Sequence, residues 1–158
     1  MRVVQRVAAV QLGAAMLALT VMGSVTVADV VLKYLFSRPI AGAYDLVESL
    51  LPVVVFNGLP ATLLRRQNIA IDLVDHPAGP RGTRLLIAVA DLVMVAMLGL
   101  IAWAMVAPAL QALEYGDRKL ELGLPVWVVW AGALVGMAGS MLAALAAAAA
   151  GPPAGAQR

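Results

Sequence analysis

Cysteine is absent from this sequence, histidine occurs only once, and charged residues make up just 13% of its 158 residues. Without cysteine the chain can form neither a disulfide scaffold nor a thiol-based catalytic site, and the common zinc sites need more Cys and His than it has. The net charge of +2 is too small to indicate nucleic-acid binding. We therefore expect no cofactor, no metal site and no nucleic-acid partner.

Apolar residues, by contrast, are abundant. They make up 63% of the chain, against about 45–50% in typical soluble domains, and the mean hydropathy is +0.93. A soluble domain of this size buries only about two-thirds of the surface that its unfolded chain exposes. The surplus apolar surface must face lipid.

Four segments are long and apolar enough to cross a bilayer, which takes about 20 residues in a helix. They span about 7–32, 44–64, 85–110 and 124–148. The alternating pattern of a lipid-facing β-barrel is missing, and the alanine-rich runs favour helix. We predict an all-α integral membrane protein with a single domain of four transmembrane helices over residues 1–150. Residues 151–158, rich in Gly and Pro, are expected to form a disordered cytoplasmic tail.

The first span raises the question of a signal peptide, because Arg2 and Arg6 precede an apolar run. That run is longer than the roughly 7–15 residues of a signal peptide, and Thr26-Val27-Ala28 is a poor cleavage site. We favour a retained membrane helix over a cleaved signal.

The distribution of basic residues predicts the orientation, since cytoplasmic loops are enriched in Lys and Arg. In a four-span topology one side carries seven basic residues: Arg2, Arg6, Arg65, Arg66, Arg81, Arg84 and Arg158. The other side carries four: Lys33, Arg38, Arg118 and Lys119. Amphipathic aromatic rings, which prefer the headgroup level, mark the second side: Tyr34, Tyr44, Trp103, Tyr115, Trp127 and Trp130. Both termini are therefore predicted to be cytoplasmic.

Asp91 stands inside the third span, where an acidic residue costs about 2.5–3.5 kcal/mol at mid-membrane. Counted from the cytoplasmic ends of the spans, Asn57 and Ser140 lie at a similar depth, and Gln11 lies somewhat nearer the cytoplasm. We predict an intramembrane polar layer of these four residues in which Asp91 hydrogen-bonds Asn57. The functional alternative is that Asp91 serves as a proton or cation site, although a lone acid lacks the converging ligands that a metal wants.

Asp45 and Glu48 share a helix face at the external start of the second span. One interpretation is favourable placement of negative charge at a helix N-terminus. The other is pairing, either with a partner protein or with Arg38 across the loop. A catalytic pair of carboxylates is improbable because nothing nearby indicates a substrate pocket.

Two further features concern the membrane boundary and helix packing. We expect Arg65, Arg66 and Arg84 to anchor the cytoplasmic side at lipid phosphates. Gly132, Gly136 and Ser140 form a stripe of small residues that permits a close helix contact, either within the chain or with another subunit.

The loop motifs resemble those of a known family. The segments Tyr34–Glu48 (YLFSRPIAGAYDLVE), Val55–Pro60, Asn68–Leu73 and Leu122–Trp127 are similar, in order and placement, to the small permease subunits of tripartite ATP-independent periplasmic (TRAP) transporters, the DctQ-like family. Two positions depart from the family pattern. Asp45 stands where Glu is usual, which keeps the charge, and Asn68 stands where His is usual, which puts any pairing role of that His in doubt.

This resemblance implies a non-enzymatic scaffold subunit in the bacterial inner membrane. Its partners would be a large permease subunit, which imports an organic-acid-type solute with sodium, and a periplasmic substrate-binding protein, in addition to membrane lipids. Candidate partner contacts are the charged residues of the external loops: Arg38, Asp45, Glu48, Glu114, Asp117 and Glu121. The alternatives are the small subunit of a tripartite tricarboxylate-type transporter and a self-sufficient small proton-coupled exporter using Asp91.

Overall fold

Four helices make up almost all of the structure, a computed structural model that describes residues 2–64 and 75–150. They are α1 (Arg2–Phe36), α2 (Ala43–Leu64), α3 (Asp75–Glu114) and α4 (Val126–Ala149). Each is long and apolar enough to cross a membrane. The predicted all-α fold with four membrane-spanning helices is confirmed, and the orientation of the termini stays a prediction.

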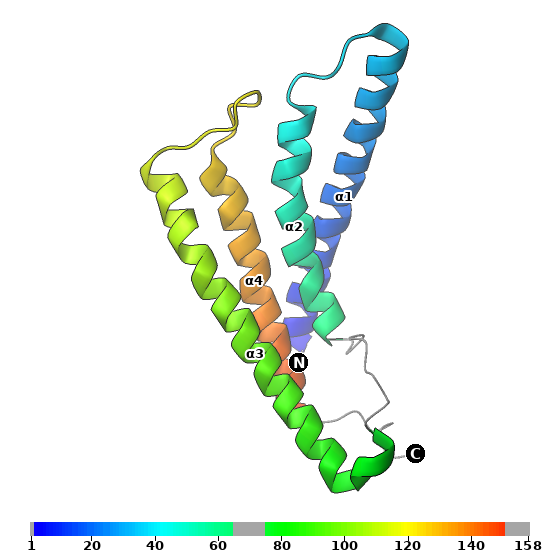
Figure 1. Ribbon diagram of the computed structural model, residues 1–158, viewed down its shortest axis with the longest axis vertical. Coiled ribbons are helices and arrows are strands. Elements are labelled where there is room, and N and C mark those ends of the chain that lie inside the picture. The colour runs from blue at the N-terminus through cyan, green and yellow to red at the C-terminus, as the bar shows by residue number, and fades with distance from the viewer. Residues whose placement is uncertain (1, 65–74, 151–158) are drawn as a thin grey trace.

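Two of the helices are longer than the apolar segments that indicated them. α1 has 35 residues and α3 has 40, which correspond to roughly 52 and 60 Å of helix. The hydrocarbon core of a bilayer is about 30 Å thick, so both helices must tilt or project beyond it. Figure 1 shows that α3 extends well past the ends of α2 and α4 on the side opposite the α3–α4 loop.

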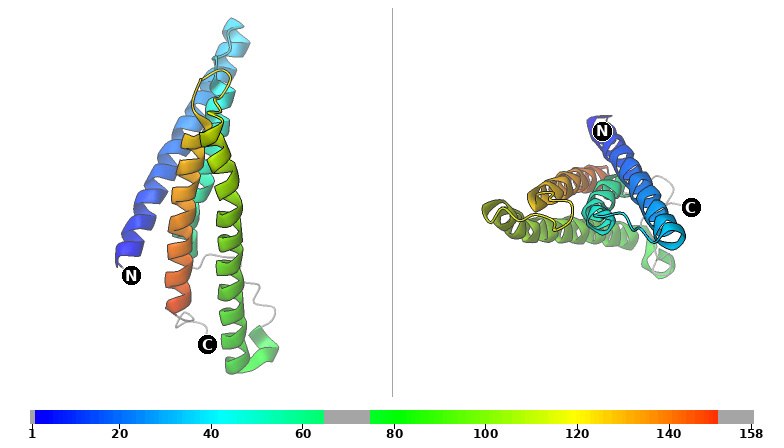
Figure 2. Two further views of the ribbon diagram at one scale, coloured as in Figure 1. Left: turned by 90° about the vertical axis from the view of Figure 1, so that its left-hand side faces the viewer. Right: turned by 90° about the horizontal axis from the view of Figure 1, so that it is seen from above.

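α4 is the central helix of the bundle. It packs against each of the other three helices, and α1 also packs against α2. In the described part of the chain, no Cα atom of α3 comes within 8 Å of a Cα atom of α1 or α2. Figures 1 and 2 show α1 and α3 flanking the α2–α4 pair. We call the end of the bundle formed by loops 37–42 and 115–125 the two-loop end.

Small side chains fill much of the interior. Most of the buried apolar residues are alanines, and the larger ones are few: Leu63, Leu98, Met105 and Met137. Large apolar side chains instead cover the outer faces of α1 and α3. A soluble monomer rarely exposes apolar patches this extensive, whereas helices that pack in lipid place small residues at their interfaces. The distribution of residue sizes thus agrees with a membrane protein.

Ser37, the residue that follows α1, adopts a backbone conformation usually taken by glycine at the end of a helix. Its backbone is in the left-handed region, with φ of 53°. The amide groups of Ser37 and Arg38 return to the carbonyl oxygens of Lys33 and Leu32, at 3.1 and 3.2 Å. The Ser37 bond, which spans four residues, is that of an αL motif, and the Arg38 bond spans six. The chain is then held by Asp29, whose carboxylate accepts a 2.6 Å hydrogen bond from the Ile40 amide.

Candidate functional site: the loop clamp and the polar contacts of α4

Two acidic side chains fasten the loops of the two-loop end to each other. The Asp45 carboxylate, near the start of α2, accepts hydrogen bonds from the backbone amides of Glu121 and Leu122, at 2.8 and 3.3 Å. In return, the Glu121 carboxylate accepts a 2.6 Å hydrogen bond from the Gly42 amide. We call these three hydrogen bonds the loop clamp. Asp45 is buried, so its charge is stabilised by these donors rather than by water.

Gly42 is required by the geometry of the loop clamp. Its φ is +79°, a conformation that side-chain-bearing residues rarely adopt, and an added Cβ would lie 2.8 Å from the Cγ atom of Leu122. Both the backbone and the neighbouring side chain therefore favour glycine. Loop 115–125 is itself folded back by hydrogen bonds from Lys119 to Leu124 and from Val126 to Asp117, each 2.9 Å.

An ion pair lies beside the loop clamp. Lys119 Nζ is 2.7 Å from Glu48 Oε2, and the Lys119 side chain is the more covered of the two. Glu48 therefore pairs within the chain with Lys119, and not with Arg38 as one of our interpretations expected. Arg38 lies exposed in the first loop. The loop clamp places loop 115–125, rather than loop 37–42, next to the side chain of Glu48. Lys119 of that loop is therefore the basic residue that reaches Glu48.

The six predicted partner-contact residues thus divide into two groups. Asp45 and Glu48 of α2 contact loop 115–125, Glu121 of that loop bonds Gly42 in loop 37–42, and Asp45 is buried. The other three, Arg38, Glu114 and Asp117, are exposed. Neither of our interpretations of Asp45 anticipated its contacts, because it binds the amides of a distant loop rather than those of its own helix.

The small-residue stripe of α4 packs within the chain. A Cβ on Gly136 would lie 2.5 Å from the carbonyl carbon of Phe56 in α2, and one on Gly132 would lie 3.2 Å from Val53. Pro60, four residues after Phe56, lacks the amide that would normally bond the Phe56 carbonyl. The α4 backbone therefore lies directly against the backbone of α2 at Phe56, and this contact needs glycine.

Three of the four residues of the predicted polar layer meet at α4. The Asn57 amide group donates to the carbonyl oxygens of Val53 and Gly132, at 2.9 and 3.2 Å. The Gln11 amide of α1 donates to the Val135 carbonyl at 2.8 Å, and Ser140 donates to the Gly136 carbonyl at 2.9 Å. All three side chains are buried. They bond backbone carbonyl oxygens rather than one another.

Gln11 fits closely against Gly139, where any Cβ would collide with its side-chain amide. Its Oε1 atom is buried and has no hydrogen-bond donor among the described residues. A buried acceptor without a donor is costly. Gln11 is thus held by packing against α4 and by a single hydrogen bond.

Asp91 does not belong to this layer, so the predicted hydrogen bond to Asn57 is wrong. Asn57 bonds α4 at Gly132, and the part of α3 beside that turn is Met105, which lines the same cavity as Trp130 and Ala133. Asp91 precedes Met105 by fourteen residues, roughly 21 Å along a helix. Our count started at the first apolar residue of the span, although the helix begins ten residues earlier and extends beyond its neighbours. Asp91 is half-buried on α3.

The predicted phosphate anchors cannot be placed. Arg65 and Arg66 lie outside the described residues, and the side chain of Arg84 is likewise not described. Their role stays a prediction.

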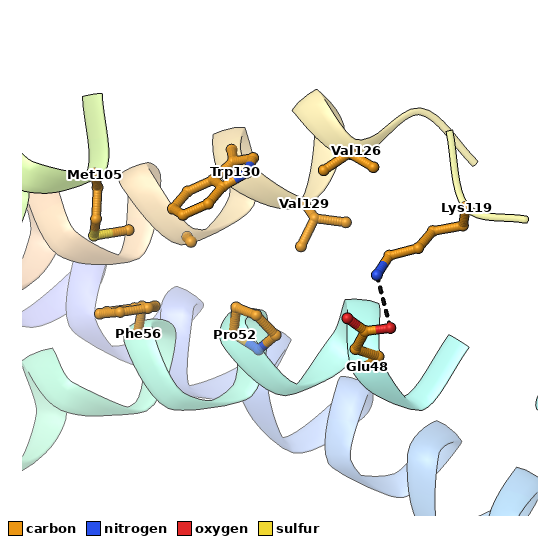
Figure 3. Close-up of a pocket in the computed structure, with 9 residues that line it drawn as sticks. Glu48, Pro52, Phe56, Met105, Lys119, Val126, Val129 and Trp130 are labelled. Carbon is orange, nitrogen blue, oxygen red and sulfur yellow. Dashed lines mark ion pairs between the residues drawn. The ribbon is translucent and has the colours of Figure 1, made fainter. Parts of the chain in front are cut away.

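A cavity of about 370 Å³ opens between α2 and α3, with α4 as its floor. Figure 3 shows Pro52, Phe56, Met105 and Trp130 along it, and the Glu48–Lys119 ion pair at the end nearest the loops. Apart from the ion pair, its lining is apolar. No group of three or more His, Asp or Glu residues that could hold a metal ion occurs in the described part of the chain.

These features define a class of protein. The chain is a multi-pass α-helical membrane protein, and the buried polar side chains described above hold helices and loops together.

Comparison with known proteins gives the family. The chain belongs to the DctQ family, described as the DctQ component of tripartite ATP-independent periplasmic transporters, whose model matches residues 22–151. It is a small permease subunit of this transporter type, as the loop motifs predicted. No curated protein and no solved structure matches the chain significantly.

Proposed function

We propose that this chain is a static scaffold in a tripartite transporter of the bacterial inner membrane, with both termini in the cytoplasm. It supports a large permease subunit that imports an organic-acid-type solute with sodium, while a periplasmic binding protein delivers the solute. The family supports the general setting, because DctQ proteins are components of such systems.

The observation that carries the scaffold role is the way the polar groups of the bundle are used. Gln11, Asn57 and Asp45 each bond a backbone group of another helix or loop, and Gly136 fixes α4 against the backbone of α2. A subunit that moves a solute needs polar groups that converge on a path and helices that can shift. These contacts instead favour one rigid arrangement.

Reconstitution of the transporter tests this proposal. The large subunit and the binding protein are placed in liposomes with a sodium gradient, with or without this chain, and uptake of a panel of organic acids is measured. We expect uptake only when this chain is present. Undiminished uptake by the large subunit without it would refute the scaffold role.

The same preparation distinguishes the proton-coupled exporter. In that alternative the purified chain alone would transport, and Asp91→Asn would abolish its activity. As a scaffold the chain alone is inactive, and Asp91→Asn leaves the uptake rate of the complete system within about twofold, because Asp91 lies far from the polar contacts of α2 and α4. A large loss of uptake with Asp91→Asn would favour a transport role for this residue.

A further inference from the structure

The cavity between α2 and α3 has the dimensions of a site for a single hydrocarbon chain. It reaches from Glu48 to Phe56 on α2, which is about 12 Å of helix. That depth is close to one leaflet of a hydrocarbon core about 30 Å thick. Its volume is about 370 Å³, and its lining is apolar apart from the ion pair at one end.

The mouth of the cavity carries one charge of each sign. Lys119 and Glu48 pair at 2.7 Å where the helices meet the loops, and half of the Glu48 side chain remains exposed. A zwitterionic phospholipid with a primary ammonium group presents the matching charges, a phosphate and an ammonium, at the depth where its acyl chains begin. An ammonium can donate to Glu48 while the phosphate contacts Lys119.

We propose that this cavity is a specific phospholipid site. One acyl chain lies along Pro52, Phe56, Val129 and Trp130, and a phosphate–ammonium headgroup of the phosphatidylethanolamine type binds the Glu48–Lys119 pair. The lipid fills the space that α2 and α3 leave because neither backbone approaches the other. This inference requires only that the four helices span a membrane and does not depend on the scaffold role.

Fluorescence of Trp130 reports the acyl chain directly, since its side chain lines the cavity. Trp103→Phe and Trp127→Phe remove the other two tryptophans, both of which are exposed. The full-length chain is then placed in vesicles containing phosphatidylethanolamine with brominated acyl chains, which quench nearby indoles.

Val129→Phe fills the cavity, and Val128→Phe, on the exposed side of α4, is the matched control. Both are first checked for an unchanged unfolding midpoint.

We expect strong quenching in the Val128→Phe variant and weak quenching in the Val129→Phe variant. Native mass spectrometry should find one phospholipid retained by the control and lost from the Val129→Phe variant. Equal quenching and equal retention in the two variants would overturn the site. Quenching that disappears when the large subunit is co-expressed would assign the cavity to that partner and would also overturn the proposal.

Comparing lipid retention between variants and between two lipids tests the headgroup assignment. Lys119→Gln should weaken retention of phosphatidylethanolamine about fivefold, which corresponds to about 1 kcal/mol. Arg38→Gln, at an exposed arginine of the other loop that does not line the cavity, should leave retention unchanged. Phosphatidylglycerol, which has the phosphate but no ammonium, should be retained less well than phosphatidylethanolamine. Equal retention of the two lipids would overturn the assignment of the ammonium to Glu48.

Discussion

α3 and α4 are adjacent, apolar and able to span a membrane, yet their surfaces have opposite roles. In the most apolar 18-residue window of each, 39% of the α4 residues are buried against 6% in α3, although the α3 window is the more apolar of the two. Hydropathy therefore does not identify the centre of this bundle. Residue size does, because α4 is rich in Gly and Ala and α3 carries Leu and Trp on its exposed side. In lipid, close packing rather than water exclusion selects the interior helix.

The largest effect should come from adding side-chain volume to the α4 stripe. Gly136→Leu places its Cβ 2.5 Å from the Phe56 carbonyl carbon, so α2 and α4 must separate, and we expect a loss of about 3 kcal/mol or more. Gly99→Leu is the matched control on α3, where a Cβ meets nothing within 4 Å. Unfolding in mixed micelles with increasing dodecyl sulfate measures both free energies. Equal losses of unfolding free energy in the two variants would show that the close α2–α4 contact does not limit side-chain size more than the surface of α3 does.

A smaller effect is expected when the loop clamp is broken. Asp45→Ala leaves the amides of Glu121 and Leu122 without their acceptor, at a cost of about 1.5–3 kcal/mol. The same unfolding assay measures the loss, and hydrogen exchange should show the two amides becoming less protected. Asp117→Ala, at an exposed acid in the same loop, is the control. If the two variants lose the same free energy of unfolding, the hydrogen bonds of Asp45 add nothing to stability beyond the effect of removing an acidic charge from this end of the bundle.

The comparison of the two helices also shows how much of the fold could be read from the sequence. Composition and span length were sufficient to predict four helices, and the Gly132, Gly136 and Ser140 stripe marked a close contact. Whether that contact was internal could not be decided, because spacing along one helix does not name its partner. The stripe packs on α2 of the same chain, where a Cβ on Gly136 would lie 2.5 Å from the Phe56 carbonyl carbon.

The candidate site was less predictable than the fold. Asp45 and Glu48 attracted attention as charges at a helix start, but their partners lie more than seventy positions away in loop 115–125. Asp91 was misplaced because the end of an apolar span is not the end of its helix. Distances along one helix follow from its rise per residue, whereas the relative heights of two helices depend on their tilt and packing, which the sequence pattern does not specify.

The smallest effect on stability should come from the exposed row of α3. Leu92, Leu100 and Leu110 lie on one face and are 69%, 61% and 59% exposed. Replacing all three with Ala should change the unfolding free energy of the isolated chain by less than about 0.5 kcal/mol per site, because lipid solvates either residue. Met137→Ala, buried in α4, should cost more, about 2 kcal/mol.

A scaffold must present a face to its large subunit, and the α3 row also carries Trp103, a residue type enriched at interfaces. We therefore expect the triple variant to copurify less well with the large subunit while remaining as stable as the unmodified chain. Unchanged copurification would place the docking face elsewhere, and reduced stability would mean that α3 is held by more than its contact with α4.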